Sequence, residues 1–356
     1  MAKAKSSIKL IFKQRAYFFL EVLTIYLGIF IFFLVLLIVP NLIVDTTSIA
    51  YSPLYFLVRA LLIVAAIPTF LFVSNFAFEP QKKELILKED ISSSRKFLEL
   101  FNISKKNYKY QLLYGILLLF LVFIPFDFFT YLFLPDLLEY STIALNVYSP
   151  SSLNSYLLEN YGIFIISVLI IQVCVSIYEE SRDRGFLANR GSDYLHNMSA
   201  VIISSFSFGL GHFNYMFTPY AIDLPIIYPL IWFLQTFFVG IILAMIVIRK
   251  RWLFPAIFAH AVNNIITLHA VWNYLQGNDF FPIALFLYCP LLIISIILLI
   301  LQFPRIKESL SIGFKEFGSY FKNNIKIKET TSHKIVRIIA DFLFGAIIFL
   351  ISIVLM

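Results

Sequence analysis

The chain has 356 residues, of which 60% are hydrophobic and 14% are charged, and its net charge is +7. A water-soluble domain is usually about half apolar and a quarter charged, so this composition excludes an ordinary soluble protein. With 40 phenylalanines and 20 tyrosines, it indicates a multi-pass membrane protein with aromatic side chains at the interfaces. The basic residues lie between the apolar runs and form no single patch, which argues against a nucleic-acid partner.

Nine apolar runs are long enough to cross a bilayer, which takes roughly 20 residues per helix. The predicted spans are 17–39, 54–78, 112–134, 161–178, 198–217, 226–248, 252–273, 281–302 and 338–356. The fold class that follows is an all-α polytopic membrane protein with about nine transmembrane helices. The first run is too long for the core of a signal peptide, so we expect it to be a retained span.

Lysine and arginine occur only in alternate connections between these runs. They precede the first span and follow the second, fourth, sixth and eighth, whereas the other connections contain none. The positive-inside rule therefore places the N-terminus in the cytoplasm and the C-terminus outside. In the basic connection after 281–302, Leu310, Phe314, Phe317 and Phe321 recur at helical spacing. Two interpretations stay open for it: an amphipathic helix lying on the membrane, and a solvated basic loop.

Ionisable residues inside spans are costly, so each is a functional hypothesis. Arg59, Asp127 and Asp341 are isolated in the sequence. We expect Arg59 and Asp341 to reach the nearby span ends and Asp127 to have an interhelical partner, and none of the three to be catalytic.

A second group of polar residues falls in three neighbouring spans. His212 lies in 198–217, His260 and Asn264 lie one turn apart in 252–273, and the stretch YEESRDRG follows 161–178. If the helix of that fourth span continues to about Asn189, Glu179 lies roughly 15 Å from its end. His260 and His212 then lie about 12 and 20 Å from the cytoplasmic ends of their own spans. The three depths agree well enough for the groups to meet in one cavity, predicted to open to the cytoplasm.

The stretch YEESRDRG itself allows two interpretations. It could be a simple stop signal after a span that ends at Tyr178. In the longer helix, Glu180 and Arg184 are four residues apart and can form an ion pair, which leaves Glu179 to face the cavity as a base. Gly185 would permit close helix packing.

These residues together suit peptide hydrolysis by an activated water. Glu179 and His212 would activate the water, and His260 and Asn264 would donate hydrogen bonds to the oxyanion that develops on the peptide carbonyl.

Three motifs in this order resemble those of the CPBP family of intramembrane endopeptidases, which includes CaaX-prenyl proteases and bacteriocin-processing or immunity proteins (Abi). They are Glu179-Glu180-x-x-x-Arg184, Phe208-x-x-x-His212 and His260-x-x-x-Asn264. The resemblance covers roughly 160–270. It implies Glu179, His212, His260 and Asn264 as catalytic residues, with Glu180, Arg184 and Phe208 in support. The polar insert Ser181-Arg182-Asp183 departs from the apolar residues usual in relatives.

The resemblance suggests three regions: an N-terminal three-span region (1–160) with a basic cytoplasmic loop, a catalytic helix core (161–273), and a C-terminal two-span region (274–356) with the amphipathic basic segment. We expect no cofactor. The alternative is zinc held by Glu179, His212 and His260, but Asn264 is a poor zinc ligand and a good oxyanion donor, which favours metal-free chemistry.

The function that we expect is intramembrane hydrolysis of a membrane-associated or lipidated peptide. The alternative is a non-proteolytic protein of the same fold, such as a bacteriocin-immunity or regulatory protein that binds a partner membrane protein. The composition is rich in lysine, isoleucine, asparagine and phenylalanine and poor in alanine. This is typical of an AT-rich microbial genome, so we expect the membrane to be a prokaryotic cytoplasmic membrane.

Overall fold

The computed structural model describes residues 2–85, 92–149, 152–217, 224–322 and 329–355, and within these ranges every regular element is a helix. The predicted all-α fold is confirmed. The longer α-helices are α1 (Ala2–Leu36), α3 (Tyr51–Leu85), α5 (Tyr108–Leu118), α6 (Ile124–Phe133), α8 (Tyr161–Glu180), α10 (Asn197–Phe213), α11 (Ile227–Lys250), α12 (Phe254–Leu275), α14 (Cys289–Leu301), α15 (Phe303–Tyr320) and α16 (Thr331–Leu355). The short ones are α2 (Val39–Ile43), α4 (Ser93–Glu99), α7 (Leu137–Ala144), α9 (Asn189–Tyr194) and α13 (Phe280–Ile283).

Five further segments complete the element order. The π-helical segments are η1 (Leu119–Phe123), η3 (Ser181–Ala188) and η5 (Ala284–Tyr288), and the 3-10 segments are η2 (Ser155–Leu158) and η4 (Asn214–Phe217). The π-helical segments join α-helices end to end, so that α5 continues through η1 into α6 and α8 continues through η3 into α9.

Eight helical stretches of the described chain are long and apolar enough to cross a membrane, and they coincide with eight of the nine predicted spans. The protein is therefore a multi-pass membrane protein. The remaining predicted span, 198–217, corresponds to α10, which has 17 residues, and the chain then enters η4. α10 packs against α11, α16, α9 and η3, and most of its side chains are buried by protein.

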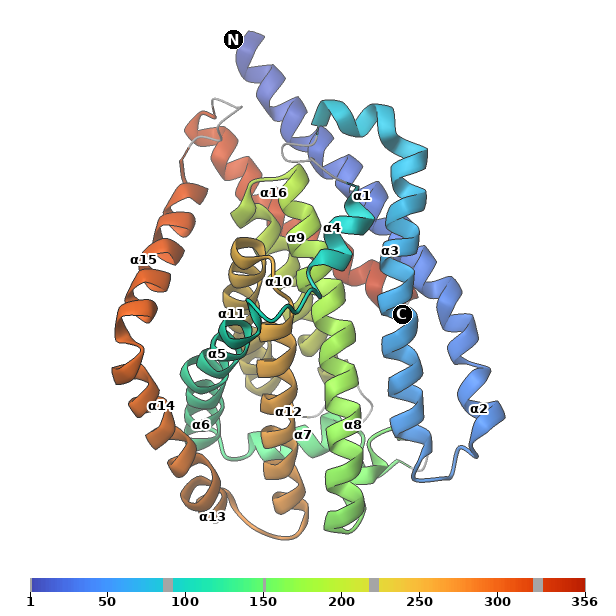
Figure 1. Ribbon diagram of the computed structural model, residues 1–356, viewed down its shortest axis with the longest axis vertical. Coiled ribbons are helices and arrows are strands. Elements are labelled where there is room, and N and C mark those ends of the chain that lie inside the picture. Colours follow the sequence, from blue (N-terminus) through green and yellow to red (C-terminus); the bar gives the residue numbers. More distant parts are fainter. Residues whose placement is uncertain (1, 86–91, 150–151, 218–223, 323–328, 356) are drawn as a thin grey trace.

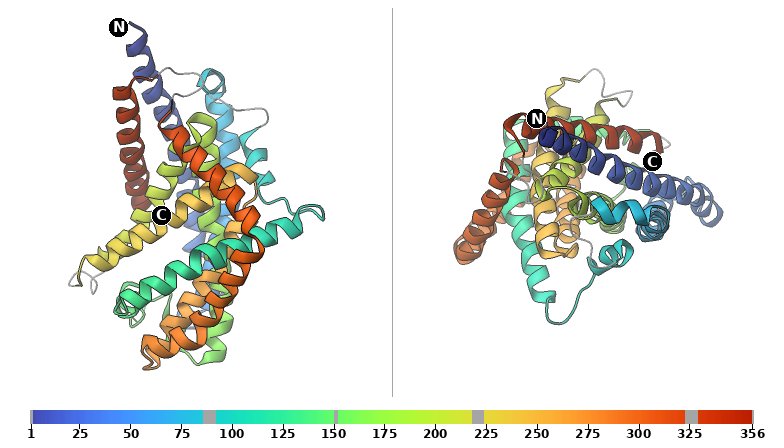
Figure 2. Two further views of the ribbon diagram at one scale, coloured as in Figure 1. Left: turned by 90° about the vertical axis from the view of Figure 1, so that its left-hand side faces the viewer. Right: turned by 90° about the horizontal axis from the view of Figure 1, so that it is seen from above.

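The helices lie at varied inclinations around a central pair, α8 and α12 (Figures 1 and 2). These two helices contact each other, and α3 packs on the other side of α8 and is itself covered by α1. The helices α14 and α15 lie on the opposite side of the bundle in Figure 1. The two central helices carry most of the candidate site residues, so the site lies inside the bundle and away from its lipid-facing surface.

The cytoplasmic end predicted for α1 is attached to the bundle by buried charge pairs. Glu21 of α1 accepts a hydrogen bond from Nε of Arg190 at 2.7 Å and another from the Tyr194 hydroxyl. Arg190 also lies 3.1 Å from Asp193, which in turn lies 3.5 Å from the Lys96 ammonium of α4. All of these side chains are buried, so they hold α1, α4 and α9 together in a fixed arrangement.

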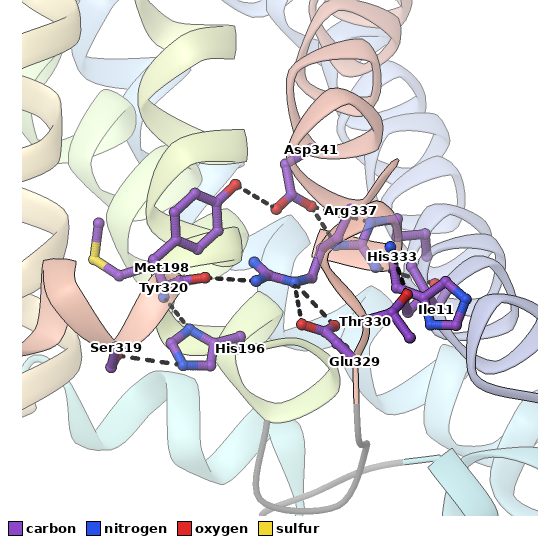
Figure 3. A network of polar contacts seen from close by, with 11 residues as sticks. Ile11, His196, Met198, Ser319, Tyr320, Glu329, Thr330, His333, Arg337 and Asp341 are labelled. Carbon is purple, nitrogen blue, oxygen red and sulfur yellow. Dashed lines mark hydrogen bonds and ion pairs between the residues drawn. The ribbon is translucent and has the colours of Figure 1, made fainter. Parts of the chain in front are cut away.

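A second buried network joins α1, α15 and α16 (Figure 3). The Asp341 carboxylate accepts hydrogen bonds from the Arg15 guanidinium and, at 2.8 Å, from the Tyr320 hydroxyl. Arg337 pairs with Glu329 at 3.0 Å. The expectation that Asp341 is isolated and reaches a span end is therefore wrong: it is fully buried and paired, because α1 brings Arg15 to it from the far end of the chain.

The amphipathic segment after 281–302 forms the helix α15. Leu310, Phe314 and Phe317 are exposed on it, and Phe321 is exposed just beyond its end. The helical form agrees with the first of the two interpretations, and contact of this face with the membrane surface stays a prediction.

Candidate active site

The helix of the fourth predicted span does not stop at Tyr178. It runs from Tyr161 through α8, η3 and α9 to Tyr194, so the longer of the two interpretations is correct. Glu179 lies 15 residues before the end of this helix, which corresponds to about 22 Å in ideal α-helical geometry. The π-helical segment begins directly after Glu180, and π-helical turns inside α-helices are frequent at functional sites.

The polar insert that follows the glutamates is accommodated by local hydrogen bonds. Ser181 donates to the carbonyl oxygen of Ile177, one turn earlier on its own helix. The Asp183 carboxylate lies 2.8 Å from Nη2 of Arg182, and its backbone carbonyl accepts a 2.6 Å hydrogen bond from the Ser204 hydroxyl of α10. Ser181 and Asp183 are buried. The polar groups of Ser181 and Asp183 therefore have partners within the protein, and the contact with Ser204 links η3 to α10.

Glu180 and Arg184 form the predicted ion pair, with Oε1 and Nη1 3.3 Å apart and both side chains fully buried. Among the described residues, no nitrogen of Arg184 has a hydrogen-bond partner. Its guanidinium instead stacks on the ring of Phe208, with Cζ 4.0 Å from the ring centroid. On the other side it packs against Gly240 of α11, where a Cβ atom would lie 3.1 Å from Nη2.

His260 contacts both glutamates. Its Nδ1 lies 2.8 Å from Oε1 of Glu180, and its Nε2 lies 3.7 Å from Oε2 of Glu179. Because a carboxylate only accepts hydrogen bonds, Nδ1 carries a proton in this arrangement and Nε2 is the ring atom that faces Glu179. The structure thus places His260 against the supporting glutamate as well, a contact that the sequence did not indicate.

Glu179 is the more accessible of the two carboxylates, with 18% of its side chain exposed against 0% for Glu180. It lines a cavity of about 300 Å³, and the other predicted site residues on its wall are Glu180, Phe208, His212, His260 and Asn264. The predicted difference between the two glutamates is therefore present in the geometry. Glu180 is paired with Arg184 and His260, whereas Glu179 faces the cavity.

His212 is oriented by its own helix. Its Nδ1 lies 3.1 Å from the carbonyl oxygen of Phe208, and because a carbonyl oxygen can only accept, this nitrogen is the protonated one. Nε2 is then an acceptor. The Phe208 ring packs edge-on against His212 at 4.7 Å and against His260 at 6.2 Å, in addition to its contact with Arg184. Phe208 thus separates and positions three site side chains at once.

Asn264 has a partner that sequence reasoning missed. Its Nδ2 donates to Oε1 of Gln172 at 3.1 Å, and Nε2 of Gln172 donates to the Tyr156 hydroxyl at 3.4 Å. The signal was available, because Gln172 is a polar residue in a span and lies seven residues, about two helical turns, before Glu179 on the same helix face. The amide of Asn264 keeps its second hydrogen for a ligand.

Asp127 lines the same cavity and has the interhelical partners that we expected. It accepts hydrogen bonds from Gln235 of α11 and, at 2.6 Å, from the Thr267 hydroxyl of α12. It is buried, and these contacts hold it between the two helices.

Further lining residues, Ser141, Leu145 and Asn154, come from the segment between α6 and α8, which the charge pattern predicts to lie outside. On the other side of Glu179, residues 183–194 are all buried. The cavity therefore extends from Glu179 away from the basic end of its helix. Its opening to the cytoplasm stays a prediction.

The described part of the chain contains no group of three His, Cys, Asp or Glu side chains arranged to hold a metal ion. Nδ1 of His260 is directed to Glu180 and Nδ1 of His212 to a backbone carbonyl. The Nδ1 atoms of both histidines are thus engaged within the protein.

Residues 161–266 match the family model described as type II CAAX prenyl endopeptidase Rce1-like. The match includes every predicted site residue from Glu179 to Asn264, and it confirms the resemblance that the motifs indicate. Neither the curated proteins nor the solved structures yielded a match.

Proposed function

We propose that this protein hydrolyses a peptide bond of a membrane-associated or lipidated substrate inside the membrane, as the match of residues 161–266 to the Rce1-like family model of type II CAAX prenyl endopeptidases suggests. The observation that carries the proposal is the pairing pattern of the two glutamates. One is fixed by a buried arginine and a histidine, and the other faces a cavity that also contains an imidazole and an amide donor.

In the proposed reaction, Glu179 accepts a proton from a water molecule that Nε2 of His212 helps to orient. The hydroxide attacks the carbonyl carbon of the scissile bond, and negative charge develops on the carbonyl oxygen. The free N–H of Asn264 and, when its ring is protonated between the two glutamates, Nε2 of His260 donate hydrogen bonds to that oxygen. Glu179 then returns the proton to the leaving amine as the C–N bond breaks.

This mechanism needs no metal ion, because a carboxylate and an imidazole supply the base and the side-chain donors supply the electrostatic stabilisation. Glu180 and Arg184 hold His260 in place through a charge pair that water does not reach. We propose a prokaryotic cytoplasmic membrane as the location.

The test is proteolysis by the full-length protein in liposomes. Wild type and Glu179→Gln are incubated with membrane-anchored peptides, including farnesylated peptides with a free C-terminus, and the products are identified by mass spectrometry. We expect a defined cleavage product with wild type only. Absence of cleavage by wild type would refute the proposal and favour the binding or immunity function. Equal cleavage by both proteins would refute the role of Glu179 as the base.

A further inference from the structure

Arg59 of α3 is a cation that lines the same cavity and has no counter-ion among the residues that the structure describes. It lies eight residues into its helix, about 12 Å from the start, and its side chain forms part of the cavity wall together with Glu179 and Asn264. The expectation that it reaches a span end is therefore wrong. Its guanidinium lies over two aromatic rings, 4.7 Å from the centroid of Tyr178 and 5.3 Å from that of Phe33.

These rings hold the guanidinium in place but do not neutralise it. Within the described chain, Arg59 makes no ion pair or hydrogen bond, and its Nε is buried without a partner. Arg59 as a whole is only partly buried. It differs from the buried arginines of the bundle, since Arg15, Arg184, Arg190 and Arg337 each have a carboxylate partner. A charge inside a membrane protein normally has such a partner, because isolation in a low-dielectric surrounding is costly.

None of the described carboxylates that line the cavity forms an ion pair with Arg59. Glu180 pairs with Arg184 and His260, and Asp127 accepts from Gln235 and Thr267. Glu179 lines the same cavity, but it is not within 4.0 Å of the guanidinium. A free guanidinium thus faces the space in which the proposed substrate would bind.

We propose that Arg59 binds a carboxylate of the substrate peptide and so positions the scissile bond against Glu179. A guanidinium matches a carboxylate with two parallel N–H···O hydrogen bonds. A single negative charge is the better match than a phosphate, because Glu179 and Asp127 already make this cavity acidic and would repel a dianion. The inference rests on the proposed function and adds a substrate feature and a specificity residue from a helix outside the matched range 161–266.

The carboxylate could be the C-terminal one or an acidic side chain, and three peptides of the same sequence distinguish these sources. One ends in a free carboxylate, one ends in a carboxamide, and one ends in a carboxamide but carries an added glutamate near the scissile bond. All three are membrane-anchored and are given to the full-length protein in liposomes. The proteins compared are wild type, Arg59→Gln, Arg59→Lys and a control, Arg305→Gln. The control changes an exposed arginine of α15 that donates a hydrogen bond to Gln302.

We expect wild type to prefer a carboxylate peptide over the plain amide by about 10- to 100-fold in kcat/KM, the range expected for hydrogen bonds to a charged group. Arg59→Gln should lose this preference through a higher KM for the carboxylate peptide and cleave the plain amide as wild type does. Arg59→Lys should retain part of the preference, and Arg305→Gln should retain it fully. Preference for the free C-terminus identifies the terminal carboxylate, and preference for the added glutamate identifies a side chain.

The opposite result would be an equal loss of activity on acid and amide peptides in Arg59→Gln. Arg59 would then only offset the charge of Glu179, and the inference would be overturned. If wild type cleaves none of the peptides, the proposed function fails, and binding decides the inference separately. With fluorescently labelled peptides, the wild-type protein should then bind the acid peptide at least about tenfold more tightly than the amide peptide. Arg59→Gln should abolish this difference in affinity. Equal affinities would overturn the inference in that case too.

Discussion

Nδ1 of His260 lies 2.8 Å from Oε1 of Glu180, the carboxylate that also pairs with Arg184. The two neighbouring glutamates therefore share one histidine but differ in what else they contact. The Glu180 side chain is paired within a cluster of charged groups and is 0% exposed, whereas Glu179 lines the cavity. The difference leads to opposite expectations for two substitutions of the same chemical kind.

Glu180→Gln should be mainly destabilising. It removes the carboxylate that pairs with Arg184 and leaves a buried cation without this partner, which typically costs about 3–5 kcal/mol. Thermal unfolding of the purified protein should show a clearly lower Tm. Glu99→Gln is the matched control, because it breaks an exposed pair with Arg95 at the same i, i+4 spacing and should cost less than about 1 kcal/mol. A Glu180→Gln protein as stable as wild type would contradict the assigned role.

Glu179→Gln should have the opposite effect. Its closest charged contact is 3.7 Å, to Nε2 of His260, so little native stabilisation is lost and the Tm should stay within a few degrees. Cleavage should fall by roughly a thousandfold, because the general base is removed. Rates measured under single-turnover conditions in liposomes separate this loss from altered substrate binding. Unchanged rates would show that another group activates the water.

Gln172→Leu should lower activity through Asn264. The substitution removes the acceptor that lies 3.1 Å from the Asn264 amide, so the amide loses its orientation. We expect kcat to fall about tenfold and Asn264→Ala to cost about 10²- to 10³-fold, as for the loss of an oxyanion donor. Because both act on one group, the double variant should be no slower than Asn264→Ala alone. Additive losses would separate the two residues.

Asp341→Asn should affect stability and leave catalysis intact. It leaves Arg15 buried without its carboxylate in the network of Figure 3, at a typical cost of about 3–5 kcal/mol. Activity per folded molecule should match wild type, because the network lies outside the cavity wall. Glu308→Gln, which breaks the exposed contact with Arg249, serves as control. Lower activity at unchanged Tm would indicate a functional connection between the two sites.

Chelation should leave cleavage unchanged. The proposed base is a carboxylate that acts on water directly, so activity after dialysis against EDTA should equal that of untreated protein. Metal analysis of the active preparation should find less than one equivalent of zinc. Loss of activity on chelation, restored by added zinc, would replace this mechanism with a metal-dependent one.

The gaps in the sequence-based interpretation have a common physical cause. Asp341 and Arg59 looked isolated because their surroundings come from helices distant in the chain, Arg15 of α1 for one and Tyr178 of α8 for the other. The polar side chain of Gln172 was visible in the sequence, but its partner Asn264 is 92 residues away, so the contact between them was not.

The amino-acid sequence was enough to establish that this chain is helical and crosses a membrane several times, since apolar runs of span length and their charged connections are local properties. It also determined the pairing of Glu180 with Arg184, which depends only on a spacing of four residues along one helix. The packing of the helices was needed to show that His260 contacts both glutamates, that Asn264 bonds Gln172 and that Arg59 faces the cavity. These contacts depend on how helices far apart in the chain are packed and rotated against one another, and a pattern along one helix does not contain that information.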